Sequence, residues 1–224
     1  RKIYDFIEDS YVPHFEDKPS ATALEFINKA RIHRLFQAST NPKTLLRSLN
    51  NSMDISEDET DPNLSFGYIE EGIKDSQIYK DILEYEKSNI IPQKFVTTRE
   101  IFQENILPYQ EKVIIWTVYL QNAYELKEYL NSFAINSELL IGSIETTQRE
   151  AIIEKFNDPN NSEFNVVIAN PASVSESISL HEGCHNAIYL ERNNHGANYI
   201  QSKNRIHRYG IPEDIITKYY YLIS

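Results

Sequence analysis

Hydrophobic and polar positions along the second half of the chain follow patterns that predict strands and helices in turn. Short apolar runs, typical of buried parallel strands, occur in VIIWTVYL, ELLIGS, FNVVIAN, NAIYLE and IITKYYYLI. Amphipathic stretches with helical spacing separate most of them, namely AYELKEYLNSF, TTQREAIIEKF and GANYIQSKNRIHR. Because helix-length crossovers join parallel strands, residues 111–224 are predicted to form an α/β domain, an open and mostly parallel sheet with helices on both faces.

The first half of the chain is mostly helical in pattern. ATALEFINKARIHRLFQAST predicts a helix that Pro42 ends, and a second pattern surrounds DSQIYKDILEYEKSN. A third helix, in TTREIFQENILPY, is predicted to open at Thr98 with an acidic residue in its first turn. Residues 1–110 are therefore predicted to form a helical linker or insertion region. Residues 54–71 within it hold seven acidic side chains and no Lys or Arg, which predicts a solvated loop.

Composition and charge limit the classes of function. With 224 residues, 41% of them hydrophobic, the chain can form one large domain or a domain with an appendage. A net charge of −11 means that nucleic-acid binding, if present, must be local rather than spread over the surface. The single cysteine, the absence of an 18-residue apolar run and the lack of a signal-peptide pattern predict a cytoplasmic protein without a membrane segment. Because the chain begins with Arg1, we expect it to be part of a longer protein.

The tetrapeptide RIHR occurs twice, at residues 31–34 and 205–208. Near the second copy, Gln201, Arg205 and Arg208 have the spacing i, i+4 and i+7, which predicts that they share one helix face before Gly210 ends the helix. Paired guanidinium groups suit the spread charge of phosphates. The alternative is a solvated face whose cations complement the helix dipole.

Four segments of the second half together resemble the motifs of a known family. KVIIWTVYLQNAYELKEYL resembles the fourth helicase motif, and LLIGSIETTQREAIIEKFND resembles the Gly-Ser stretch and helix that follow it. VVIANPASVSESISL resembles the fifth motif and YIQSKNRIHRYG the sixth, Q-x-x-x-R-x-H-R-x-G. In this order they resemble the C-terminal RecA-like lobe of superfamily-two helicases, most of all the Swi/Snf-type translocases of double-stranded DNA in a bacterial-type form. We therefore expect a cytoplasmic protein, nucleoid-associated if it is bacterial.

The resemblance implies a role for each matching residue. In the family, ATP and Mg²⁺ are bound mainly by an N-terminal RecA-like lobe, which is absent from this sequence, and the second lobe supplies arginine fingers. By position, Arg205 and Arg208 are the fingers, and Gln201 helps to close the cleft. The segment of Ser177, Ile178 and Ser179 falls near the nucleotide, so the implied cofactor-binding residues are Ser177, Ser179, Arg205 and Arg208. The residues implied to contact the nucleic-acid backbone are Thr117, Ser143 and Asn170.

The first RIHR is similar to the segment that joins the two lobes in this group. Ile27 stands where the sixth motif has its Gln, and Phe36 where it has its Gly, so Arg31 and Arg34 are predicted to be structural or to contact nucleic-acid backbone.

The sequence also departs from the family. Ser177 replaces a common Gly, Asn204 a common Asp and Ile211 a common Gln. No G-x-x-x-x-G-K-[ST] and no D-E-x-H type motif occurs, so this chain alone is predicted not to hydrolyse ATP. The alternative function is a non-catalytic module, binding nucleic acid or protein, that retains the RecA-like fold.

Three further features have simple interpretations. HEGCH at 181–185 matches the zinc-protease pattern in letters, but Gly183 and the strand that follows argue against a helix, so no metal site is predicted. Cys184 is predicted to be a small buried residue rather than a nucleophile. The tyrosines of KYYYLI are predicted to pack in the sheet rather than to stack on bases.

Overall fold

The computed structural model describes residues 1–10, 21–50, 77–171, 178–191, 196–208, 212 and 215–223. The chain forms two compact units, one comprising residues 1–92 and Ser224, the other residues 93–223. The predicted acidic loop at 54–71 and Ser177 lie outside the described residues. None of the helices that the structure describes is long and apolar enough to cross a membrane.

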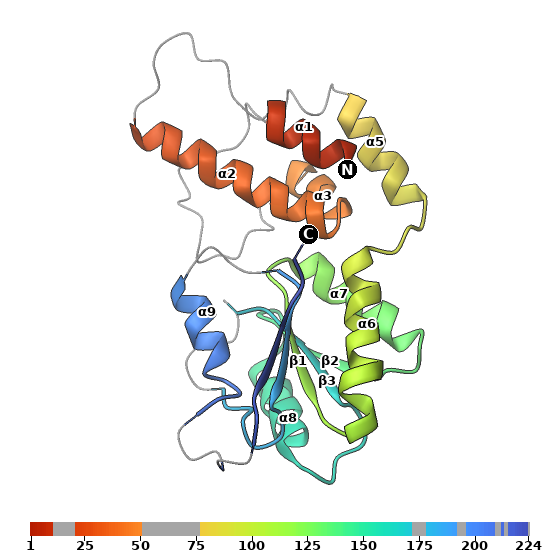
Figure 1. Ribbon diagram of the computed structural model, residues 1–224, viewed down its shortest axis with the longest axis vertical. Helices are drawn as coiled ribbons and strands as arrows, with labels where there is room; N and C mark the ends of the chain where they lie inside the picture. The colour runs from red at the N-terminus through yellow and green to blue at the C-terminus, as the bar shows by residue number, and fades with distance from the viewer. Residues whose placement is uncertain are drawn as a thin grey trace. The chain divides into compact units, whose positions relative to one another are not determined.

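The first unit is helical, as the sequence predicts. Its described helices are α1 (Lys2–Ser10), α2 (Ala21–Thr40), α3 (Lys43–Asn50) and α5 (Gln77–Lys87) (Figure 1). The α2 helix ends before Pro42, and the side-chain oxygen of Asn41 accepts a hydrogen bond from the backbone N–H of Lys43 at 3.2 Å, which caps the start of α3. Among the residues whose burial is described, the helices pack around a core that contains Ile7, Leu45, Leu46, Ile78 and Ile82.

The first RIHR lies on α2 and makes local contacts within this unit. Arg34 is buried, and its guanidinium donates to Oε1 of Gln37 at 2.7 Å. Arg31 donates to the backbone carbonyl of Glu8 on α1. These contacts support the structural role predicted for both arginines.

The second unit contains the sheet. Its elements are α6 (Gln93–Asn105), a 3₁₀ turn (Leu107–Tyr109), β1 (Val113–Trp116), α7 (Leu120–Asn131), β2 (Ser137–Leu140), α8 (Thr146–Asn157), β3 (Val166–Ala169), β4 (Asn186–Tyr189), α9 (Gly196–Lys203) and β5 (Lys218–Tyr221). The five strands have the order β2-β3-β1-β4-β5, and all four neighbouring pairs are parallel. The predicted RecA-like open parallel sheet is thus confirmed.

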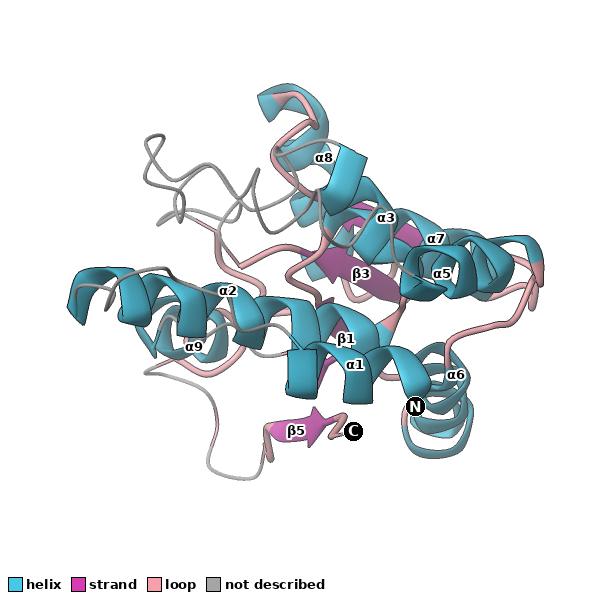
Figure 2. Ribbon diagram, turned by 90° about the horizontal axis from the view of Figure 1, so that it is seen from above, coloured by secondary structure: helices cyan, strands magenta, loops and turns pink. Residues whose placement is uncertain are grey.

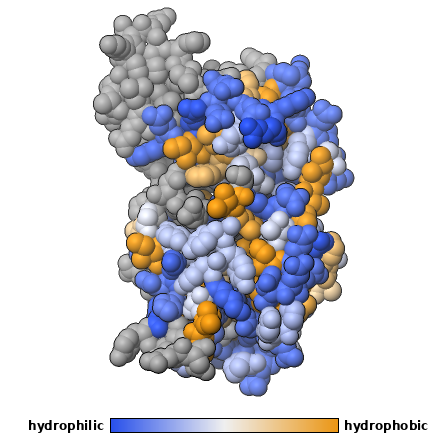
Figure 3. Space-filling view, viewed as in Figure 1, coloured by the Kyte–Doolittle hydropathy of each residue, from blue (hydrophilic) through white to orange (hydrophobic). Residues whose placement is uncertain are grey.

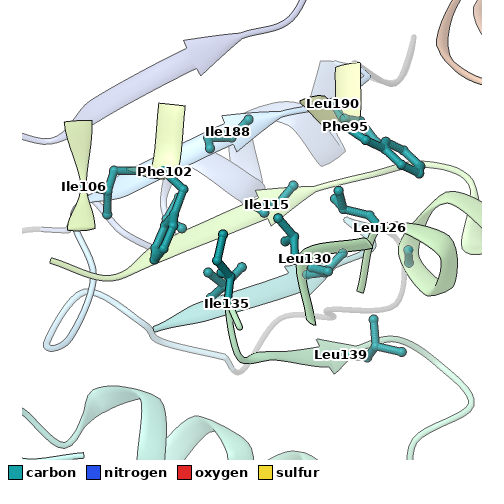
Figure 4. Close-up of a cluster of buried hydrophobic side chains, with 14 of the residues drawn as sticks. Phe95, Phe102, Ile106, Ile115, Leu126, Leu130, Ile135, Leu139, Ile188 and Leu190 are labelled. Carbon is teal, nitrogen blue, oxygen red and sulfur yellow. The ribbon is translucent and has the colours of Figure 1, made fainter. Parts of the chain in front are cut away.

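Alternate residues of the strands point to opposite faces, and each face has its own core. On one face, Val113 and Ile115 of β1 pack with side chains of α6 and α7, and Figure 4 shows Phe95 and Phe102 directed toward the sheet. On the other face, Ile114 and Trp116 pack with α8 and α9. Figures 1 and 2 show α6 and α9 on opposite sides of the strands. Helices therefore cover both faces, as predicted.

The α6 helix begins earlier than the sequence analysis predicts. Thr98 does not open it, because the helix starts at Gln93, directly after Pro92. Thr98 is fully buried in the second turn, and its hydroxyl donates to the backbone carbonyl of Lys94 at 2.7 Å. The compact unit accordingly starts at Gln93 rather than at the predicted boundary between residues 110 and 111.

Candidate nucleotide and nucleic-acid interface

The carboxyl ends of the central strands carry three polar residues that meet at one edge of the sheet. Thr117 follows β1, Asn170 follows β3 and Glu191 lies two residues after β4. Because β1 pairs in parallel with both β3 and β4, these ends lie side by side. In open parallel sheets, ligands bind beyond the carboxyl ends of the strands, so this edge is a candidate site.

Glu191 forms hydrogen bonds with residues from other elements at this edge of the sheet. Its Oε2 accepts hydrogen bonds from the hydroxyl of Thr117 at 2.9 Å and from the backbone N–H of Val118 at 3.0 Å. Its Oε1 accepts from the side-chain amide of Asn122 on α7 at 2.6 Å. The carboxyl group therefore joins the end of β4 to the end of β1 and the first turn of α7.

Burial dominates the electrostatics of Glu191. Loss of solvent raises the pKa of its carboxyl group, and the hydrogen bonds from Val118 and Thr117 and the charge of Lys94 act in the opposite direction. Burial also lowers the pKa of Lys94, whose ammonium group donates to the backbone carbonyl of Leu190 at 3.0 Å. Glu191 is not among the site residues predicted from the sequence, although an acidic residue directly after the apolar run NAIYL is a signal that could have identified it.

The residues predicted to contact nucleic-acid backbone differ in exposure. Thr117 and Asn170 are buried, at 0% and 2% exposure. The side-chain amide of Asn170 donates to the backbone carbonyl of Val118 at 2.7 Å, so both residues hold the segment that follows β1. Ser143, after β2, is exposed, and its hydroxyl lies 3.1 Å from that of Tyr124 on α7. Of the three, Ser143 is the one with a side chain at the surface.

The helix that carries the sixth motif is shorter than predicted. It ends at Lys203 rather than near Arg208, and the next residues tighten into i→i−3 hydrogen bonds, from Arg205 N to Ser202 O and from Ile206 N to Lys203 O. The tightened turn directs Ile206 into the core, where it is fully buried. Hydrogen bonds from Asn204 N to Ile200 O and from His207 N to Lys203 O keep the i→i−4 pattern on either side of this turn.

Because α9 ends at Lys203, Arg205 and Arg208 lie beyond it, and these two residues and Gln201 do not share one helix face as predicted. Arg205 is 5% exposed, and its guanidinium donates to the backbone carbonyl of Ile178 at 3.1 Å. Gln201 and Arg208 are exposed, and the Nε of Arg208 donates to the carbonyl of Asn204 at 3.3 Å.

Arg205 nevertheless joins the fifth and sixth motifs. Besides the guanidinium contact with Ile178, the backbone carbonyl of Arg205 accepts a hydrogen bond from the N–H of Leu180 at 3.0 Å. Ser179, between them, is half-buried, and its hydroxyl lies 2.6 Å from Nδ1 of His181. The structure thus brings the segment predicted to lie near the nucleotide into contact with the predicted arginine finger.

The HEGCH segment forms a turn against the end of α8. A Cβ atom on Gly183 would lie 2.3 Å from the carbonyl oxygen of Phe156, so only glycine fits here. Cys184 is buried as predicted, and burial raises the pKa of its thiol to about 12, which leaves no thiolate at neutral pH. Among the described residues, no three His, Cys, Asp or Glu side chains form a group able to hold a metal ion.

Comparison with known proteins identifies the family. The sequence profile of the helicase conserved C-terminal domain matches residues 95–210, slightly more than half of the chain, and the chain belongs to this family. No match was found among curated protein sequences.

Solved structures share the fold. The C-terminal part of the Fun30 ATPase domain superposes with a TM-score of 0.64 at 19% identity, covering 99% of this chain and 79% of that one. The SWI2/SNF2 ATPase core of Sulfolobus solfataricus in complex with double-stranded DNA superposes with a TM-score of 0.55 at 15% identity, covering 99% of this chain and 36% of that one. The chain therefore shares the fold of these domains, and both matches include its N-terminal helices.

Proposed function

We propose that the chain is the C-terminal motor lobe of an ATP-dependent translocase on double-stranded DNA. In this role Arg205 and Arg208 act as arginine fingers on ATP that is held, together with Mg²⁺, mainly by another RecA-like lobe. One observation carries the proposal: in a member of the helicase C-terminal family, Arg205 connects the segment 178–180 to the turn that presents Arg208. The duplex partner is suggested by the SWI2/SNF2 core, whose structure contains double-stranded DNA.

The chemistry of the two arginines follows from their positions. A guanidinium group next to the transferred phosphoryl group stabilises the charge that develops in the transition state, and it does so more strongly where water is excluded. Arg208 is exposed on the turn and so is accessible to nucleotide on a second lobe, with Gln201 exposed one helical turn before Arg205. Arg205 is desolvated and fixes the turn in place.

The proposed grip on DNA is local, as the net charge of −11 requires. Ser143 presents a surface hydroxyl to the phosphate backbone, while Thr117 and Asn170 hold the segment that follows β1. Hydroxyl and backbone N–H contacts of this kind bind phosphate without reading base sequence. Translocation on duplex DNA without strand separation is the expected outcome.

The test is DNA-stimulated ATP hydrolysis by the complete protein that contains this chain and the P-loop lobe. Arg205→Ala and Arg208→Ala should each lower kcat by about 10³-fold or more, because an arginine finger contributes about that much, with nucleotide binding retained. Arg31→Ala, in the other RIHR copy, should keep most of the activity. The 224-residue chain alone should not hydrolyse ATP.

Two results would contradict the proposal. If the complete protein shows no DNA-stimulated turnover, or if Arg205→Ala and Arg208→Ala leave turnover unchanged, the chain is a binding module that retains the fold. Displacement of a third strand from a triplex measures translocation, and unwinding of a duplex measures strand separation. Measuring both distinguishes the two activities.

A further inference from the structure

Two hydroxyl pairs join α9 to strands β4 and β5 just before Arg205. The hydroxyl of Tyr189 lies 2.8 Å from Oγ of Ser202, and those of Tyr199 and Tyr221 are 2.7 Å apart. Ser202 donates its own hydrogen to the backbone carbonyl of Tyr199 at 2.7 Å. Because a serine hydroxyl has one hydrogen, Tyr189 must be the donor in its pair, so the strand donates to the helix.

Aromatic packing surrounds these hydroxyls. The rings of Tyr189 and Tyr221 stack at 5.1 Å, and Tyr199 lies 5.6 Å from Tyr189. Tyr189 and Ser202 are each 2% exposed. Burial raises the pKa of Tyr189, which keeps its hydroxyl protonated and able to donate. A hydrogen bond shielded from water in this way restricts the movement of the helix more than a solvated one does.

The alternation of β5 shows which tyrosines take part. Tyr219 and Tyr221 lie on the face that packs against α9, whereas Tyr220 packs into the core on the opposite face. Tyr219 adds a weaker contact, with its hydroxyl 3.4 Å from the carbonyl of Lys203 and its ring centroid 4.8 Å from the Lys203 ammonium group. Tyr220 therefore provides a matched control on the same strand.

The anchored end of α9 leads directly to Arg205. The backbone N–H of Arg205 donates to the carbonyl of Ser202 at 3.3 Å. Ser202 therefore contacts both Tyr189, through its hydroxyl, and Arg205, through its carbonyl. A displacement of α9 relative to the sheet would move the guanidinium with it.

We propose that the hydroxyls of Tyr189, Tyr199 and Tyr221 are positioning groups that set the placement of Arg205 for phosphoryl transfer. The proposal rests on the function proposed above, in which Arg205 acts on ATP. It assigns to this surface of the sheet a role in turnover beyond packing, because a misplacement of about 1 Å at a catalytic group can lower the rate about 100-fold.

The test replaces single tyrosines by phenylalanine in the complete protein. Tyr189→Phe, Tyr199→Phe and Tyr221→Phe keep the rings and remove one oxygen each. Each should lower the DNA-stimulated kcat by about tenfold and change KM for ATP by less than about twofold, because the groups act on transition-state placement. Tyr220→Phe should retain the wild-type kcat. An unchanged kcat in all three variants, with kcat of Arg205→Ala lowered as predicted, would overturn this inference and leave the proposed function intact.

A double-variant cycle separates positioning from simple loss of stability. In an Arg205→Ala background, Tyr199→Phe should leave the residual turnover unchanged, because the group through which it acts is absent. If Tyr199→Phe lowers the residual turnover by the same factor as in the wild type, its effect is independent of Arg205 and the inference is wrong. If Arg205→Ala itself has no effect on turnover, the proposed function fails first.

Discussion

At the scale of single residues, the most informative group is Glu191. It is a fully buried carboxylate whose hydrogen-bond donors come from the segment after β1 and from α7. Burial disfavours the charged form of this group and raises its pKa, while the charge of Lys94 and the three donors act in the opposite direction. Each donor is therefore worth more than an ordinary surface hydrogen bond.

Replacing Thr117 by Val tests how much one hydrogen bond to Glu191 contributes to stability. The change keeps the shape of the side chain and removes a donor 2.9 Å from Glu191, so it should lower the free energy of unfolding by about 1.5–3 kcal/mol. Urea unfolding followed by the fluorescence of Trp116, the sole tryptophan, measures the effect next to the site. Thr98→Val is the control, because Thr98 is equally buried but donates to a neutral carbonyl that belongs to Lys94. A cost for Thr117→Val no greater than for this control would show that Glu191 does not depend on the hydroxyl.

At the scale of elements, the end of α8 and the turn at 181–185 are fitted to each other. The ammonium group of Lys112, before β1, donates to the carbonyls of Phe156 at 2.8 Å and Asp158 at 2.7 Å, which satisfies acceptors at the end of the helix. Gly183 lies against the same carbonyl of Phe156. The turn that leads into β4 can approach the helix only because this position has no side chain.

Gly183→Ala should therefore destabilise the sheet unit by about 1–3 kcal/mol, because the obstructing atoms belong to the backbone of α8 and cannot rotate away. Thermal and urea unfolding measure the loss. Gly196→Ala is the matched control: apart from the adjoining residues and its own helix backbone, no atom of the described residues lies within 4 Å of the added methyl group, so its effect should stay within about 0.5 kcal/mol. Equal stability of the two variants would contradict the close packing at Gly183.

At the scale of the whole molecule, the chain divides into a helical unit and a sheet unit, each with its own core. The space-filling view shows hydrophobic groups interspersed with hydrophilic ones on the face displayed (Figure 3). The boundary between the units determines which piece can fold alone. Residues 93–110 contain Phe95, Phe102 and Ile106, all buried in the core on one face of the sheet.

We expect residues 93–223 to fold as an independent unit and residues 111–223 not to do so. Removing α6 deletes two core phenylalanines, each worth about 3–5 kcal/mol, which is comparable to the total stability of a small domain. Size-exclusion chromatography and cooperative urea unfolding, again followed by Trp116, compare the two fragments. A stable, monomeric 111–223 fragment would instead support the boundary predicted from the sequence.

The sequence by itself determined the elements and their burial. The apolar runs predicted all five strands, and the end of α2 before Pro42 was predicted correctly. Motif order predicted the family, which the match over residues 95–210 confirmed. These features depend on residues that are close together in the sequence, because the spacing of apolar residues in a strand or helix indicates which positions are buried.

Only the tertiary structure decided where α6 begins, where α9 ends and how the polar residues pair. Thr98 lies within α6 with its side chain buried, and α9 ends at Lys203, before the residues of the second RIHR. The hydrogen-bond donors to Glu191 lie 69 to 74 positions away in the sequence. Lys94 donates to the carbonyl of Leu190, which is 96 positions away. Such pairs form only when folding brings separate strands together, so the local spacing of residues in the sequence does not predict them.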